Sequence, residues 1–138
     1  MDTKWLVPLM ALLLAGCSSP LTYKAVVHAY LEPTDMSAAA AIEDITAFMH
    51  TRGYRLDSKI DSKSNGRASV LLNYSNGSTT LVSFDNASDP NCFNFDVFIP
   101  EQSGDYSGAR SISDAFVANF RHSQGWHVTE NDSCRIAP

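Results

Sequence analysis

The amino-acid sequence predicts an α+β fold in which two helices pack on one face of a mostly antiparallel sheet of five to six strands. Two stretches repeat apolar residues at the 3.6-residue period of a helix, and several shorter runs are rich in β-branched and aromatic residues. Two of these short runs flank Asn76-Gly77, the strongest two-residue signal for a β-hairpin. Helices placed before and after a series of strands favour a layered α+β domain.

The first half of the folded part is expected to run strand, helix, strand. Residues 22–31 are β-rich, and the turn after them leads to a helix that either Asp35 or Ser37 caps. The helix is expected to end at Gly53, which suits the left-handed position after a helix C-terminus. A short strand over 54–60 follows and is closed by a polar loop over 61–66. The apolar face of the helix consists of Ala38, Ala41, Ile42, Ile45, Phe48 and Met49.

The second half is expected to be a strand meander, then a helix and a last strand. Residues 67–75 and 78–85 form the hairpin around Asn76-Gly77, and a loop over 86–91 leads to a strand over 92–99 that alternates core-facing and outward residues. A polar region over 100–108 precedes the second helix, which runs to Gly125, and a strand is expected over 126–136. The order of elements is that of an elaborated ferredoxin-like fold.

An apolar run precedes the folded part. The run from Leu6 to Ala15 is too short to span a bilayer, which takes roughly 20 residues, and it ends in small residues as a cleaved signal peptide does. It closes with Leu14-Ala15-Gly16-Cys17. This tetrad resembles the lipobox of bacterial lipoproteins, in which Leu, a small residue and Gly precede a cysteine that is lipidated and becomes the mature N-terminus. The alternative is an ordinary signal peptide, cut after Ala15 or Gly16.

The resemblance covers only the first 17 residues, and it implies a cellular localisation and a lipid anchor. It implies that residues 1–16 are removed, that Cys17 carries the lipid, and that 17–21 form a short tether to a single periplasmic domain over 22–138. Several acyl chains make such anchoring stable. Ser18 follows the cysteine where an Asp would signal retention at the inner membrane, so the resemblance implies the outer membrane of a Gram-negative cell, with the domain facing the periplasm.

Cys92 and Cys134 remain when Cys17 is lipidated, and two cysteines in an oxidising compartment predict a disulfide. The competing interpretation is a thiolate metal site, which would require CxxC-type spacing that the sequence lacks. The alternation of the strand over 92–99 places Cys92 on the face opposite Phe93. A bridge therefore requires Cys92 to lie at the entrance of its strand or a bulge in the last strand.

Composition and motifs argue against several classes of function. The net charge is −5, and scattered Lys and Arg residues give no electrostatic footprint for nucleic acid or for anionic lipid headgroups. No nucleophile elbow, phosphate loop or dinucleotide fingerprint occurs, so no cofactor and no catalytic residue is predicted. Candidates for paired acids are Glu43 with Asp44 on the first helix, and Asp85, Asp89 and Asp96 around the third hairpin; Glu43 and Asp44 are neighbours on a helix and cannot share a proton. Metal binding is not predicted from the four histidines, which are His28, His50, His122 and His127.

A binding role remains, and the sequence predicts a non-enzymatic accessory or assembly factor that binds another envelope protein. Alternate residues of the first strand face the core. The sheet face opposite the helices would therefore carry either Lys24, Val26, His28 and Tyr30 or the residues that alternate with them. A half-apolar sheet face of this kind is a usual docking surface. Two alternatives stay open: an immunity-type lipoprotein that inhibits a toxin acting in the periplasm, and a cell-wall or lipid hydrolase.

Overall fold

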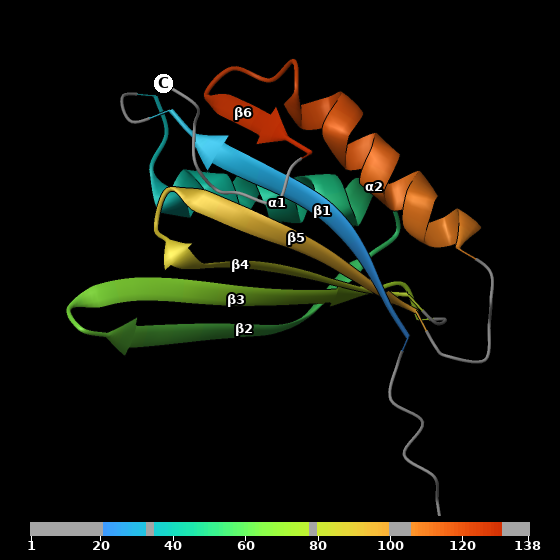
Figure 1. The fold of residues 1–138 in the computed structure, drawn as a ribbon, viewed down its shortest axis with the longest axis horizontal. Coiled ribbons are helices and arrows are strands. Elements are labelled where there is room, and N and C mark those ends of the chain that lie inside the picture. The colour runs from blue at the N-terminus through green and yellow to red at the C-terminus, as the bar shows by residue number, and fades with distance from the viewer. Residues whose placement is uncertain (1–20, 33–34, 78–79, 100–105, 131–138) are drawn as a thin grey trace, which may run out of the picture.

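The computed structural model describes residues 21–32, 35–77, 80–99 and 106–130. In chain order, the elements are β1 (Leu21–Leu31), α1 (Ala38–Thr51), β2 (Arg55–Ser64), β3 (Arg67–Ser75), β4 (Leu81–Asp89), β5 (Cys92–Ile99), α2 (Ser107–Phe120) and β6 (Trp126–Thr129). The six strands form one sheet in the order β2-β3-β4-β5-β1-β6, and every neighbouring pair is antiparallel. Both helices pack on the same face of this sheet (Figure 1). The expected α+β class is therefore confirmed.

The topology is that of a ferredoxin-like fold with two additional strands. The unit β5-α2-β6 encloses β1, because β1 lies between β5 and β6 in the sheet. Three strands lie between β1 and β2 of the unit β1-α1-β2 in the sheet order, whereas the smallest split βαβ motif has one strand there. The two additional strands form the meander that carries β2 to the far edge of the sheet (Figure 1).

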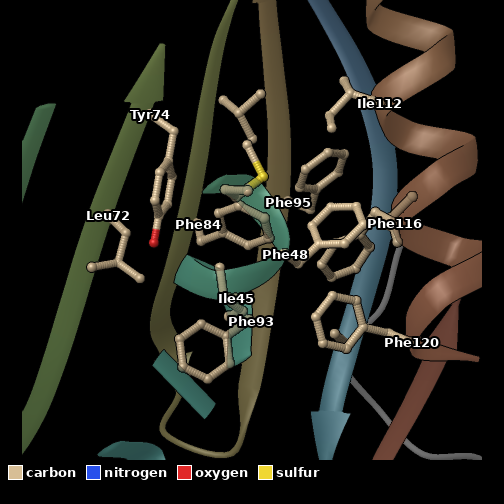
Figure 2. Close-up of a cluster of buried hydrophobic side chains, with 14 of the residues drawn as sticks. Ile45, Phe48, Leu72, Tyr74, Phe84, Phe93, Phe95, Ile112, Phe116 and Phe120 are labelled. Carbon is tan, nitrogen blue, oxygen red and sulfur yellow. The ribbon is translucent and has the colours of Figure 1, made fainter. Parts of the chain in front are cut away.

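The core lies between the helices and the sheet and is built largely from aromatic rings (Figure 2). Phe116 of α2 lies at its centre: its ring stacks on Phe95 at 4.8 Å between centroids and with 8° between the planes. The same ring contacts Phe84 at 5.4 Å, Phe120 at 4.6 Å and Phe48 of α1 at 5.8 Å. Rings from both helices and from two central strands thus share one cluster, which fixes how the helices sit on the sheet.

The ends of α1 follow from the residues that the sequence places there. The Ser37 hydroxyl accepts a hydrogen bond from the Ala40 amide at 3.2 Å, which makes Ser37 the N-cap of the two candidates. At the other end, Gly53 has φ +80°, and its amide donates to the His50 carbonyl. The Tyr54 amide donates to the Met49 carbonyl. This is the glycine-terminated helix end that the sequence indicates.

The strand after α1 is longer than expected. β2 continues to Ser64, and the loop expected over 61–66 is wrong except for its last two residues. Asn65 and Gly66 have φ values of 50° and 76° and form a two-residue turn, with Ser64 paired to Arg67. Positive φ at both positions matches the hairpin turn whose twist fits two antiparallel strands, and Asn-Gly is the pair that favours it.

The second Asn-Gly pair does not form the tight hairpin that the sequence predicts. β3 and β4 are antiparallel neighbours as expected, but Ser75 pairs with Leu81, so residues 76–80 form the connection. β4 then runs to Asp89 through the predicted loop, with an irregular register between Asp85 and Asp89. The strand over 92–99 is confirmed at both ends.

The second helix begins and ends earlier than expected. It starts at Ser107, inside the stretch expected to be a polar loop, and ends at Phe120, five residues before Gly125. Gly125, with φ +84°, instead belongs to the turn that brings Trp126 back into the core. Of the last strand, the structure shows Trp126–Thr129; residues 131–136 of that prediction lie outside the described part.

Candidate functional site: the open face of the sheet

The sheet face turned away from both helices is the candidate functional surface, and we call it the open face. The register settles which residues belong to it, because side chains alternate between the two faces of a strand. On β1, Val27, Ala29 and Leu31 point to the core, so His28 and Tyr30 point to the open face. Beyond β1, the open face carries Ser58, Ile60, Leu71, Asn73, Leu81, Ser83, Asp85, Asn94, Asp96 and Phe98.

A polar network ties three strands together across the open face. The ring Nδ1 of His28 on β1 donates to Asn94 Oδ1 on β5 at 2.8 Å. The Asn94 amide in turn donates to Asp85 Oδ1 on β4 at 3.4 Å. On the other half of the sheet, the Asn73 amide of β3 donates to the Ser58 hydroxyl of β2 at 2.9 Å. These bonds hold the polar side chains flat against the sheet, in fixed positions that a partner could contact.

Apolar side chains accompany this network. Ile60 is 49% exposed and pairs across the strands with half-buried Leu71, while Leu81 is 37% exposed and pairs with half-buried Phe98. The sequence places residues of the first strand and Cys92 on this face but not these four. For Leu71, Leu81 and Phe98 the available signal is parity, because each stands one residue away from a core-facing aliphatic residue. Ile60 stands between Lys59 and Asp61 and has no such signal.

One end of the open face is closed. Tyr30 is 2% exposed and Cys92 is fully buried, although both belong to this face and pair with each other in register. Burial raises the pKa of the Tyr30 phenol above its usual value. Cys92 lies at the entrance of β5, the position that a bridge to Cys134 requires. Cys134 itself lies outside the described residues.

The strand β2 forms one edge of the sheet, and its residues are exposed along almost its whole length. Arg55 pairs with Asp57 at 3.2 Å, and Lys59 lies 3.9 Å from Asp61. The pKa of Asp57 is lowered, chiefly by a hydrogen bond from Ser75 and also by Arg55. A register irregularity between Leu56 and Ser58 interrupts the ladder at the same place. Charges and a bulge are devices that keep an edge strand from pairing with other chains.

The four histidines are dispersed. His50 and His122 are exposed near the ends of the two helices, and His127 lies 2.8 Å from Glu32 at the edge formed by β6. His28 and His127 both belong to the open face, because His127 pairs with Tyr30, but His127 lies on the edge strand β6. Within the part of the chain that the structure describes, no group of three or more His, Cys, Asp or Glu side chains could hold a metal ion.

The acidic residues that the sequence offers as candidates lie apart, on helix α1 and on strands of the sheet. Asp44, one of the two adjacent helix acids, accepts a hydrogen bond from the Trp126 indole at 3.2 Å, so it ties α1 to the start of β6. This contact joins residues that are 82 positions apart, so no local sequence pattern indicates it. A surface hollow of about 290 Å³ lies beside it, between the helices, and is lined by Asp44, Ala47, Phe48, Thr51, Asn119, Phe120 and Ser123. Asp85 and Asp96 lie on the open face, and Asp89 pairs with Cys92 at the closed end of that face.

The apolar run over 6–15 and the Leu14–Cys17 tetrad lie outside the described residues. Among the residues that are described, no helix is long and apolar enough to cross a membrane. Comparisons with family models, with curated proteins and with solved structures gave no match. Any function must therefore be argued from the residues themselves.

Proposed function

We propose that the protein is an outer-membrane lipoprotein that binds another protein of the cell envelope through the open face of its sheet and catalyses no reaction. The anchor rests on Leu14-Ala15-Gly16-Cys17 and on Ser18 after it. The docking role rests on the open face, where exposed Ile60 and Leu81 stand beside a fixed polar network. That face is the single observation that carries the binding role.

The size of the open face suits a specific interface. The five long strands, β1 to β5, at about 4.8 Å spacing and about 30 Å in length, give an area on the order of 700 Å². A standard protein interface covers about 800 Å² on each partner. Apolar anchors surrounded by polar side chains are also the usual composition of such interfaces. The face thus offers enough surface for a stable complex without help from the helices.

We propose further that Cys92 and Cys134 form a disulfide. Thr129 pairs with His28, and His28 pairs with Asn94, so β1 alone separates β6 from β5. Two strand spacings amount to about 10 Å. The five residues from 130 to 134 can extend about 16 Å, which is enough to reach Cys92.

The disulfide is tested by alkylation of the denatured, membrane-purified protein. Without reductant we expect no thiol to react, because Cys17 carries lipid and the other two are bridged. After reduction two alkyl groups should be added. Two additions without reductant would exclude the bridge.

The binding role is tested by a crosslinked pull-down from native membranes, with a Cys17→Ser variant as control. We expect one envelope protein to be recovered with the lipidated form and to be lost with the variant, because the variant leaves the membrane surface. Recovery of a toxin that acts in the periplasm would favour the immunity-type alternative. If no other protein is recovered with either the lipidated form or the variant, the docking role is refuted and a hydrolase is the alternative to test.

A further inference from the structure

The domain has two unlike ends, and the chain enters at one of them. β1 starts at Leu21, which pairs with Ile99 at the end of β5. Because all neighbouring strands alternate in direction, the same end holds the start of β2, the connection from β3 to β4, the last turn of α1 and the first turn of α2 (Figure 1). We call it the entry end.

The proposed anchor keeps the entry end close to lipid. Only residues 18–20 separate Cys17 from Leu21. Four steps of 3.8 Å allow at most about 15 Å between the two Cα atoms. Electrostatic attraction to a charged bilayer acts over about 8–10 Å at physiological salt, so side chains that project from this end come within its range.

Arginines gather at the entry end. Arg52 follows the last turn of α1, Arg55 starts β2 with its side chain 80% exposed, and Arg110 is exposed in the first turn of α2. Asp57 is at the same end and is paired with Arg55. Glu101 and Asp105 belong to residues 100–105, outside the described part. In the sequence Arg110 is far from Arg52 and Arg55, so the linear pattern shows no footprint of three arginines for anionic headgroups.

A hollow and two leucines complete the entry end. The hollow, of about 220 Å³, is lined by Arg52, Asn76 and Ser111 together with Tyr54 and α2 residues. The Arg52 guanidinium lies 5.5 Å from the Phe48 ring centroid, which holds the cation at the wall of this hollow. Leu56 and Leu81, exposed by 38% and 37%, lie at the same end, at the starts of β2 and β4; Leu56 pairs with core-facing Tyr74, whereas Leu81 belongs to the open face. Cations next to exposed aliphatic side chains suit the boundary between headgroups and acyl chains.

The opposite end is mixed in charge. Glu32 and Asp35 follow β1 there and Asp89 ends β4, while Lys63 and Arg67 flank the turn between β2 and β3. The entry end is therefore distinguished by its arginines together with the short tether.

We infer that the entry end lies on the phosphate headgroups of the membrane that holds the Cys17 lipid, with Arg52, Arg55 and Arg110 contacting phosphates. This inference rests on the proposed anchor. The domain then stands with its sheet upright on the bilayer, because the strands run from the entry end to the far end. The open face is left accessible from the side, where an envelope protein can reach it.

Orientation is measured on the purified lipidated protein in nanodiscs of phosphatidylethanolamine and phosphatidylglycerol that contain a spin-labelled headgroup lipid. The amide signals of Gly53 and Gly77 report the entry end, and those of Gly66 and Gly125 report the far end. We expect relaxation at the first pair to exceed that at the second at least tenfold. The tether alone would produce part of this contrast, so charge dependence decides the outcome.

The deciding variant is Arg52→Glu with Arg55→Glu and Arg110→Glu. Its matched control, Lys59→Glu with Lys63→Glu and Arg67→Glu, makes the same charge change in the exposed residues of β2 and β3. Each basic residue near an anionic bilayer contributes roughly a fivefold preference. We expect the first variant, and wild type in phosphatidylcholine discs, to lose at least two thirds of the contrast, whereas the control keeps it. Retention of the contrast in the first variant would overturn the inference.

Mass spectrometry of the same sample separates this inference from the proposed function. An unmodified Cys17 would refute the anchor and with it the premise of the inference. A lipidated Cys17 with no charge-dependent orientation would refute the inference alone. Amide spectra of both variants that match wild type away from the changed residues show that the fold is intact.

Discussion

The two halves of the sheet are held by different interactions. β1, β4 and β5 are backed by the helices, and their core side chains, such as Phe84, Phe93 and Val97, are fully buried. Residues 59–70, which we call the ribbon, extend β2 and β3 beyond the paired part of β4, and residues 59–68 are all exposed (Figure 1). The first half is stabilised by buried apolar area, and the ribbon by cross-strand hydrogen bonds and a turn. Substitutions of exposed side chains in the ribbon should therefore cost less stability than substitutions of buried side chains in the first half.

The strongest test of the comparison is Phe116→Ala. The variant removes the ring that contacts four other aromatic rings, so we expect the free energy of unfolding to fall by about 3–5 kcal/mol. Urea unfolding measures this change. A loss below about 1 kcal/mol would show that the aromatic cluster does not hold the helices on the sheet.

Asn86→Ala tests the joint between the halves. Asn86 is 4% exposed; its side-chain oxygen accepts from the Val70 amide at 2.7 Å and its amide donates to the Pro90 carbonyl at 3.2 Å. Loss of both bonds leaves buried backbone groups unpaired, which costs about 1–3 kcal/mol. We expect hydrogen exchange at the Val70 amide to rise sharply. Unchanged exchange there would mean that the ribbon is independent of this side chain.

Gly66→Ala tests what holds the ribbon itself. The left-handed conformation at φ +76° costs a residue with a Cβ atom about 1–2 kcal/mol. No other atom lies near the added Cβ, so the effect should come from the backbone alone. We expect faster hydrogen exchange confined to residues 59–70. Faster exchange in the helices as well would contradict the division into two halves.

Tyr74→Phe tests the contact between β3 and α1. The Tyr74 hydroxyl lies 2.8 Å from the Thr46 hydroxyl, and its removal should cost about 1 kcal/mol. Burial raises the pKa of Tyr74, while the bond to Thr46 lowers it by less. The folded state therefore holds the phenolic proton more tightly than the unfolded state, and stability falls as the pH rises above about 10. We expect the variant to lose less stability than wild type between pH 9 and 11, as measured by urea unfolding; an identical loss would show that Tyr74 does not contribute.

Ile60→Ser should have the smallest effect on stability. Ile60 is 49% exposed on the open face, and substitutions at such positions usually change stability by less than about 0.5 kcal/mol. A larger loss would show that the ribbon depends on buried apolar area after all.

The secondary structure could be predicted from the sequence in the half of the molecule that is buried against the helices, and less accurately in the ribbon. The core alternation of β5 and the cap and glycine end of α1 were correct, because local chemistry and burial agree there. The ribbon was missed, since polar residues such as Ser62 and Lys63 indicate a loop until Asn65-Gly66 is seen to pair them with β3. Conversely, Asn76-Gly77 suggested a tight turn that the register of Ser75 with Leu81 excludes.

The candidate site could be predicted only in outline. The sequence indicates that β1 has an open face, but the membership of Ile60, Leu81 and Phe98 depends on the register of strands that are distant in sequence. Arg110 likewise joins Arg52 and Arg55 at the entry end only through the topology. Local patterns determine which residues alternate, whereas the neighbours of each residue depend on pairing across the whole sheet.

The central claim, that the open face docks an envelope protein, is tested most directly by photo-crosslinking in intact cells. A photoreactive phenylalanine analogue replaces Ile60 or Leu81 on the open face, or, as matched controls, exposed Ala47 and Asn119 on the helices. We expect both open-face positions to crosslink to the same protein, and Ile60→Ser to reduce that crosslink at position 81 while the helix positions give none. Crosslinks of equal strength from the helix positions, or none from the open face, would contradict the claim.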